Sequence, residues 1–219
     1  MKFDAATLQV LKNFSSINNA ILFKEGNRLA TISPGKTVMA RATLTQEIPA
    51  KFAIYDLSRF LGTISLFDQP ELTFKDGSVD ISQDNNTFNY AFTDVSLIVV
   101  PPEKDIVLAD AEVQFTLTTD ALKKVQRALN VASLPEIAVT GKNGKILLQA
   151  VDSKGSTNDT FTIEVGETTG TFRMVIRADN IKLLEGEYEV SISSKGLSHF
   201  KGKTVEYWIA VEGNSTYQA

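Results

Sequence analysis

The sequence predicts an α+β protein built from two similar halves, each with two helices backed by sheets. Three observations lead to this prediction. Four segments have the apolar spacing of amphipathic helices, the segments between them are short, β-rich and bounded by turn residues, and this order occurs twice. The chain has 219 residues, which is enough to form two cores of about 100 residues each.

The helices are predicted over residues 4–16, 56–67, 118–132 and 177–184. The third has the clearest apolar stripe, with Leu122, Val125 and Leu129 on one side. An aspartate lies at or near each start, where a capping side chain and the helix dipole favour a negative charge. These aspartates are Asp4, Asp56, Asp120 and Asp179.

The strands are predicted from β-branched and aromatic residues between turn signals. Asp76-Gly77 and Asn143-Gly144 are typical of tight hairpins, and Pro34-Gly35 of a type II turn. The predicted strands cover residues 20–23, 36–44, 52–55, 71–75, 79–83, 87–92 and 96–100 in the first half, and 113–117, 137–140, 145–151, 161–165, 172–176, 188–193 and 204–211 in the second.

A repeated pattern and a proline-containing connector predict the domain boundary. Residues 52–61 and 172–181 each resemble a strand that runs directly into a helix through an acidic start. Between the halves, Pro101-Pro102 opens a charged stretch of about residues 100–112 that is typical of an extended linker. We therefore predict an N-terminal domain over 1–108 and a C-terminal domain over 109–219.

The charge pattern is the strongest functional signal. The chain has 26 acidic and 22 basic residues, yet beyond their first turns the predicted helices contain no Asp or Glu. Their basic residues are Lys12, Arg59, Lys123, Lys124, Arg127 and Lys182. Basic helices on an acidic protein indicate a surface for a polyanion such as DNA. These faces have neither aromatic residues nor a base-reading array, so a DNA partner would be contacted through its backbone.

The residue types needed for catalysis are scarce, and we predict that the protein is not an enzyme and needs no cofactor. His199 is the single histidine and there is no cysteine, so neither a metal site nor a nucleophilic triad is indicated. Residues 141–145 contain Gly-Lys but lack the Ser or Thr that completes a phosphate loop, and they fit a hairpin better. No apolar run is long enough to span a membrane.

The chain resembles the DNA polymerase sliding clamps (processivity factors) of T-even-type bacteriophages over nearly its whole length. The most specific stretch is 53–66, with Ala53-Ile-Tyr-Asp-Leu57, Phe60-Leu61-Gly62 and Ser65-Leu66. Leu11-Lys-Asn-Phe14 with Ile17-Asn18 supports it. The resemblance implies the DNA-clamp fold, in which three subunits close head to tail into a six-domain ring that encircles duplex DNA and makes the polymerase processive.

The resemblance also implies partners and sites. Lys12, Arg127 and Lys182 fall where the family has basic inner-helix residues, whereas Arg59 is predicted from this sequence alone. The implied partners are double-stranded DNA, the C-terminal peptide of the polymerase and an ATP-dependent clamp loader, with action in the cytoplasm of the infected bacterium and a further role in late transcription. A partner-peptide pocket is expected at Ile106, Val107, Leu108, Tyr207, Ile209 and Val211, although these residues could instead pack the domain junction.

Two other classes of function remain open at this stage. A phage virion protein of the tail or baseplate would fit the Ser/Thr-rich β structure but would leave the basic helices unexplained. A carbohydrate-binding β module would need clustered exposed aromatic residues, and the single Trp gives that reading little support.

Overall fold

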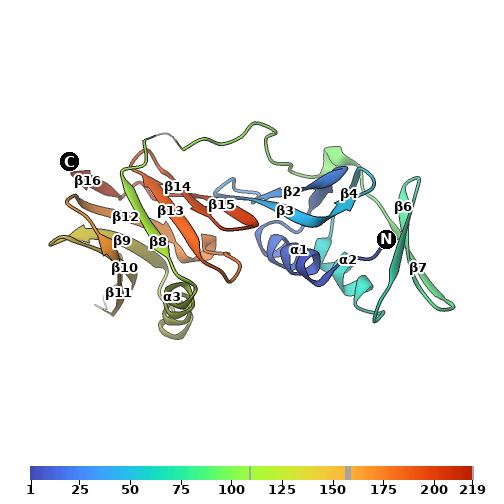
Figure 1. The fold of residues 1–219 in the computed structure, drawn as a ribbon, viewed down its shortest axis with the longest axis horizontal. Helices are drawn as coiled ribbons and strands as arrows, with labels where there is room; N and C mark the ends of the chain where they lie inside the picture. The colour runs from blue at the N-terminus through green and yellow to red at the C-terminus, as the bar shows by residue number, and fades with distance from the viewer. Residues whose placement is uncertain (109, 156–158, 219) are drawn as a thin grey trace. The chain divides into compact units, whose positions relative to one another are not determined.

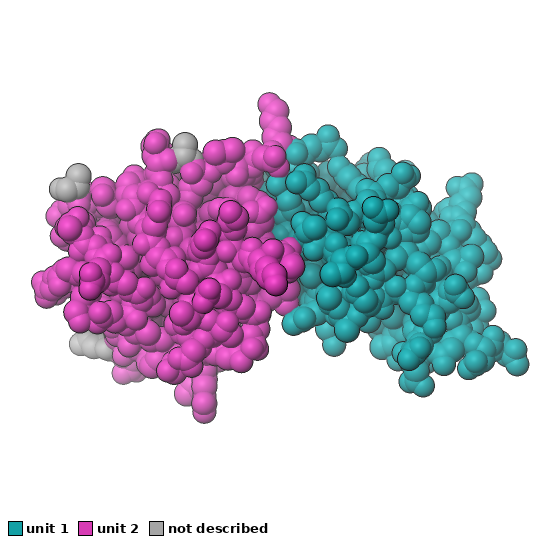
Figure 2. Space-filling model, viewed as in Figure 1, with its two compact units in different colours: residues 1–103 teal, residues 104–219 magenta. Residues whose placement is uncertain are grey.

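The computed structural model describes residues 1–108, 110–155 and 159–218. The chain divides into two compact units, unit 1 over Met1–Glu103 and unit 2 over Lys104–Ala219 (Figure 2). The division lies inside the segment predicted as a connector. Among the described helices, none combines the length and hydrophobicity that a bilayer-spanning segment requires.

Unit 1 contains two α-helices and three small antiparallel strand groups. Helices α1 and α2 lie side by side, with α1 against β3 (Figure 1). β1 pairs with β4, β2 pairs with β3, and β5, β6 and β7 form a meander. The elements are α1 (Ala5–Ile17), β1 (Ile21–Phe23), β2 (Gly26–Ile32), β3 (Val38–Ile48), β4 (Phe52–Ile54), α2 (Leu57–Ile64), β5 (Glu71–Lys75), β6 (Ser78–Gln83), β7 (Asn86–Ala91) and the 3-10 turn η1 (Val95–Leu97).

Aspartate caps start both helices of unit 1, as the sequence predicts. The Asp4 carboxylate accepts a hydrogen bond from the Thr7 N–H at 2.6 Å, and the Asp56 carboxylate accepts one from the Arg59 N–H at 2.8 Å. Each bond satisfies a donor that the first helical turn leaves unpaired. The two helix starts are therefore set by local sequence.

Stacked aromatic rings fill much of the core of unit 1. The Phe52 ring lies 4.4 Å from the Phe23 ring, 4.8 Å from the Phe92 ring and 5.0 Å from the Phe74 ring, measured between centroids. Phe23 and Phe52 are buried. Because β1 and β4 pair at Phe23 and Phe52, this cluster joins the short two-stranded sheet to the β5–β7 meander.

The described residues of unit 2 form one α-helix and two antiparallel sheets. β11, β10, β9, β12 and β16 form one sheet in that order, and β15, β14, β13 and β8 are neighbours in the other. α3 contacts β10 and β11. The elements are β8 (Val113–Leu117), α3 (Thr119–Ala132), β9 (Glu136–Lys142), β10 (Lys145–Val151), β11 (Thr160–Glu167), β12 (Thr171–Arg177), the 3-10 turn η2 (Ala178–Asn180), β13 (Tyr188–Ser193), β14 (Leu197–Lys201), β15 (Val205–Ala210) and β16 (Thr216–Gln218).

Local signals place α3 and the hairpin that follows it. The Thr118 hydroxyl accepts a hydrogen bond from the Ala121 N–H and caps α3, so Asp120 lies in the first turn and is not the cap. Asn143 and Gly144 both have positive φ, 52° and 82°, as a two-residue hairpin turn requires. β9 and β10 pair from this turn outward.

The predicted fourth helix, over 177–184, is wrong. Only the single 3-10 turn η2 forms there, and no side chain caps it. The next residues are held in non-helical positions, because the Leu184 N–H donates to the Tyr207 hydroxyl at 3.1 Å and the Leu184 carbonyl accepts from the Tyr188 hydroxyl at 2.7 Å. Ile181 and Leu183 are both buried, and this spacing of two does not suit a helix face.

The strand predicted over 96–100 is also wrong, and three strands were missed. The Asp94 carboxylate accepts from the Ser96 N–H at 2.7 Å and turns the chain into η1, after which Pro101-Pro102 has no N–H to pair. β2, β14 and β16 form where no strand was predicted. β2 opens at Gly26, whose φ is +98°, with a bulge beside it.

Candidate nucleic-acid interface

The basic side chains of unit 1 lie on the exposed faces of α1 and α2. Lys12 is exposed on the side of α1 away from its buried Val10, Leu11 and Phe14. Arg59 is exposed in the first turn of α2, and its guanidinium carbon lies 5.9 Å from the centroid of the Tyr90 ring. The ring restricts the guanidinium while leaving it at the surface.

The carboxylates at these helix starts stay ionised because they are hydrogen-bonded. The Thr45 hydroxyl, followed by the Thr7 N–H, lowers the pKa of Asp4 below its ordinary value. The Arg59 N–H, followed by the Asn19 side chain, lowers the pKa of Asp56. Both acids belong to the helix caps and not to the helix bodies, and the Asp56 carboxylate also lies close enough to Arg59 for the two charges to attract each other.

The basic side chains of unit 2 lie on α3. Lys123, Lys124 and Arg127 are exposed, opposite the buried stripe that contains Leu122, Val125 and Leu129. Lys124 Nζ lies 2.7 Å from the Asp120 carboxylate, one turn earlier, and Lys123 Nζ lies 2.5 Å from the Glu185 carboxylate. Arg127 has no ion-pair partner within the described residues.

Lys182 is not on a helix. It follows η2 and is half-buried, and its N–H donates to the Asn180 carbonyl at 3.0 Å. The prediction that Lys182 projects from a fourth helix is wrong, because that helix does not form. The other five predicted basic residues do lie on the exposed faces of helices.

The predicted peptide-pocket residues do not form one exposed surface. Val107 is 81% exposed, and Ile106 and Leu108 are half-buried in a segment without helix or strand. Tyr207 and Ile209 are 0% exposed on β15, and Val211 is buried just beyond it. Burial raises the pKa of Tyr207 to about 12, so its hydroxyl stays protonated as a structural hydrogen-bond partner.

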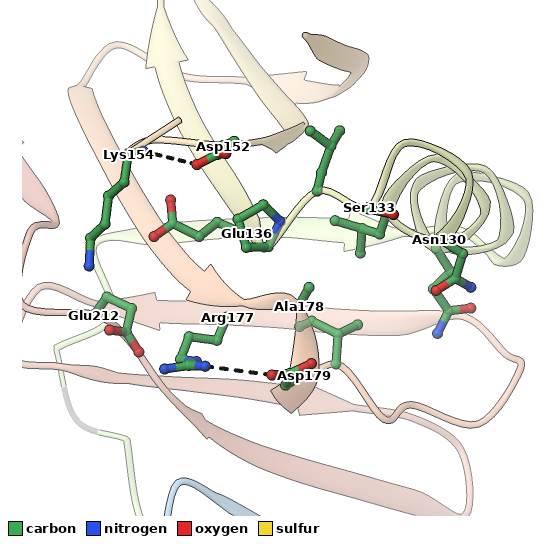
Figure 3. A pocket seen from close by; sticks show the side chains of 14 residues that line it. Asn130, Ser133, Glu136, Asp152, Lys154, Arg177, Ala178, Asp179 and Glu212 are labelled. Carbon is green, nitrogen blue, oxygen red and sulfur yellow. Dashed lines mark hydrogen bonds and ion pairs between the residues drawn. The ribbon is translucent and has the colours of Figure 1, made fainter. Parts of the chain in front are cut away.

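A charged hollow of about 830 Å³ lies in unit 2, between the end of α3 and the ends of β9 and β12 (Figure 3). The Glu136 side chain points into it, is 8% exposed, and accepts a 3.3 Å hydrogen bond from the Ser153 N–H. Arg177 pairs with Asp179 at 3.5 Å on the opposite wall. No group of three potential metal ligands occurs among the described residues. Sequence reasoning missed this hollow because the end of α3 and four separate connecting segments form it.

A second hollow, of about 620 Å³, lies in unit 1 beside α1 and α2. Its lining is mainly apolar, with Lys12 also lining it, and includes Phe3, Leu8, Leu61, Ile64, Phe67 and Leu72. The sequence gives a partial signal for it, since Leu61 and Phe67 are apolar residues of the segment predicted as a helix over 56–67. Both are only half-buried, whereas Thr63 of the same segment is buried.

Family models match both halves of the chain. The model described as DNA polymerase processivity factor matches residues 2–101, and the model described as gp45 sliding clamp, C terminal, matches residues 114–213. The sliding clamp of Vibrio phage KVP40 is 32% identical, with 97% of this chain and 99% of that protein covered. The chain belongs to the phage sliding clamp family.

Other sliding clamps agree with this assignment. Those of Escherichia phage RB69 and Enterobacteria phage T4 are 32% and 30% identical, with 99% of each chain covered. The chain is thus a phage sliding clamp and DNA polymerase processivity factor, and these relatives give no support to the virion-protein alternative.

Solved structures share the fold at low sequence identity. A DNA polymerase III β sliding clamp from Bartonella birtlesii has a TM-score of 0.73 at 12% identity, covering 97% of this chain and 64% of that one. The PCNA of A. fulgidus, described as bound to the C-terminal region of FEN-1, has a TM-score of 0.69 at 14% identity, covering 95% and 96%. The sliding clamp fold is therefore the fold of this chain.

Proposed function

We propose that three copies of this sliding clamp close head to tail into a ring of six units and that the ring encircles duplex DNA. In this ring α1, α2 and α3 face the duplex through Lys12, Arg59, Lys123, Lys124 and Arg127. The observation that supports the proposal is the exposure of these cations on helices with no carboxylate beyond the first turn, in a chain of net charge −4.

Such a surface suits sliding because its contacts are few and independent of base sequence. Lysine and arginine on an exposed helix face can exchange between successive phosphates. Retention on DNA then comes from the closed ring, and the polymerase stays at the primer end because it is tethered to that ring. The clamp needs no catalysis of its own for this role.

The subunit contacts would join unit 2 of one copy to unit 1 of the next. β11 is an edge strand that pairs with β10 on one side, and its Phe161, Ile163 and Val165 are only half-buried. An edge strand of this kind is suited to pairing with another chain. We propose that β11 adds to the β5–β7 sheet of its neighbour, as a head-to-tail interface requires.

The polymerase would bind through its C-terminal peptide. An exposed Val107 between half-buried Ile106 and Leu108 offers an apolar strip for such a peptide. Tyr207, Ile209 and Val211 would support this part of unit 2 from within its core. The peptide-bound relative described above makes this mode of partner binding a reasonable one for the fold. An ATP-dependent loader would open the ring and place it on DNA. The ring would act in the cytoplasm of the infected bacterium, where late transcription would also use the DNA-bound clamp.

The test is primer extension by the cognate polymerase on primed circular DNA, with clamp loader and ATP. The variant Lys123→Glu/Lys124→Glu/Arg127→Glu should lose the clamp-dependent increase in product length while remaining trimeric by light scattering, at about 72 kDa. The matched control Lys195→Glu/Lys201→Glu/Lys203→Glu makes the same charge change at exposed positions around β14. Equal processivity of the two variants would refute the proposed DNA face.

A further inference from the structure

Two of the three cations on α3 are already neutralised within the subunit. Lys123 Nζ lies 2.5 Å from Glu185 Oε1, and Lys124 Nζ lies 2.7 Å from Asp120 Oδ2. All four side chains are more than half exposed. A phosphate that approaches α3 must therefore compete with a carboxylate at both lysines.

The two carboxylates differ in origin. Asp120 lies in the first turn of α3, where the helix dipole favours an acid and where a lysine four residues later is a common partner. Local helix stability explains that pair. Glu185 comes from the segment between η2 and β13, so its pairing with Lys123 depends on the tertiary fold.

The backbone next to Glu185 is held by two buried tyrosines. The Leu184 N–H donates to the Tyr207 hydroxyl at 3.1 Å, and the Tyr188 hydroxyl donates to the Leu184 carbonyl at 2.7 Å. The tyrosine rings are 6.0 Å apart at 66°, and both are essentially inaccessible. Because both polar groups of Leu184 are fixed from inside the core, the next residue is directed onto the surface of α3.

We propose that Glu185 is a built-in competitor for DNA phosphate at Lys123. The Glu185 carboxylate pairs with the Lys123 ammonium group whenever that group is not bound to a phosphate. As the ring advances and a phosphate contact breaks, the ion pair forms again. Exchanging one anion for another at the same cation changes the free energy little, so no position along the duplex becomes a trap. This inference rests on the proposed DNA face of α3 and adds a residue that weakens the binding of that face to phosphate.

The direct test is Glu185→Gln, which keeps the size of the side chain and removes its charge. Binding of the trimer to a short linear DNA duplex is measured by fluorescence anisotropy over a range of KCl concentrations. If each of three copies gains one phosphate contact, the slope of log affinity against log salt should steepen by up to about 2.7. The control is Glu189→Gln, the same change at an exposed position on β13.

A double-mutant cycle separates competition from a general charge effect. Glu185→Gln should have no effect on the slope in a Lys123→Ala background, because the contested ammonium group is gone. The inference would be overturned if Glu185→Gln still steepened the salt slope in the Lys123→Ala background. It would also be overturned if Glu189→Gln steepened the slope by the same amount. Failure of the proposed DNA face would give a different result, because the wild-type trimer would then not bind the duplex at any KCl concentration tested.

Discussion

Arg127 offers the sharpest test of the proposed DNA face. Its guanidinium is exposed on α3 and has no ion-pair partner in the described part of the chain, so it is available to phosphate without displacing a carboxylate. Arg127→Ala places a strong helix former at an exposed helical position, and its stability should change by no more than about 0.5 kcal/mol. Any loss of binding can then be separated from a loss of folding.

The expected magnitude follows from the count of contacts. Each phosphate contact contributes about 0.9 to the steepness of log affinity against log salt. A trimer that lacks Arg127 in all three copies should therefore have a slope that is shallower by up to about 2.7. The assay is duplex binding by fluorescence anisotropy at several KCl concentrations, with melting temperature and light scattering on the same samples. Lys201→Ala is the control, since it removes one exposed cation from β14, a strand of the other sheet of unit 2. Equal slopes for Arg127→Ala and Lys201→Ala would refute the reasoning.

Three further predictions concern stability. Phe52→Ala should reduce the free energy of unfolding by about 3–5 kcal/mol, because the ring is buried among three other rings; a loss below about 1 kcal/mol in urea titration would contradict this packing role. Asp56→Ala should reduce the free energy of unfolding by about 1 kcal/mol, because the α2 cap is lost. Since the pKa of Asp56 is lowered in the folded state, this difference in unfolding free energy between variant and wild type should shrink as acid protonates the carboxylate. Tyr207, with its pKa raised to about 12, should resist ionisation in the folded protein, so stability should fall as pH rises above the ordinary tyrosine value near 10; an absorbance titration with every tyrosine ionising near pH 10 before unfolding would be inconsistent with that burial.

Local chemistry explains which helices could be predicted. The caps at Asp4, Asp56 and Thr118 are each followed by apolar residues at helical spacing, and a helix forms at all three. Segment 177–184 has an aspartate and apolar residues too, but two tyrosine hydroxyls bind the backbone of Leu184: that of Tyr188, four residues later, and that of Tyr207 on β15. The long-range bond from Tyr207 works against the local helical pattern, and a single sequence contains no sign of it.

The candidate site, like the helices, could be predicted only where local sequence determines it. Helical periodicity correctly placed Lys12, Arg59 and Arg127 on exposed faces, because burial of the opposite stripe determines which side faces solvent. The pairing of Lys123 with Glu185 depends on how the segment before β13 returns to α3, which periodicity does not encode. The burial of Tyr207 was likewise hidden, since alternation along β15 cannot say which face meets the core of unit 2.

Trp208 gives this chain an internal optical reporter. It is the single tryptophan of the sequence, is nearly buried on β15, and stacks on His199 with the ring centroids 4.8 Å apart. Its emission therefore reports the integrity of the β15 and β14 packing in unit 2. Comparing tryptophan fluorescence with circular dichroism during unfolding would reveal whether the two halves of a subunit melt together or in turn, without adding any label.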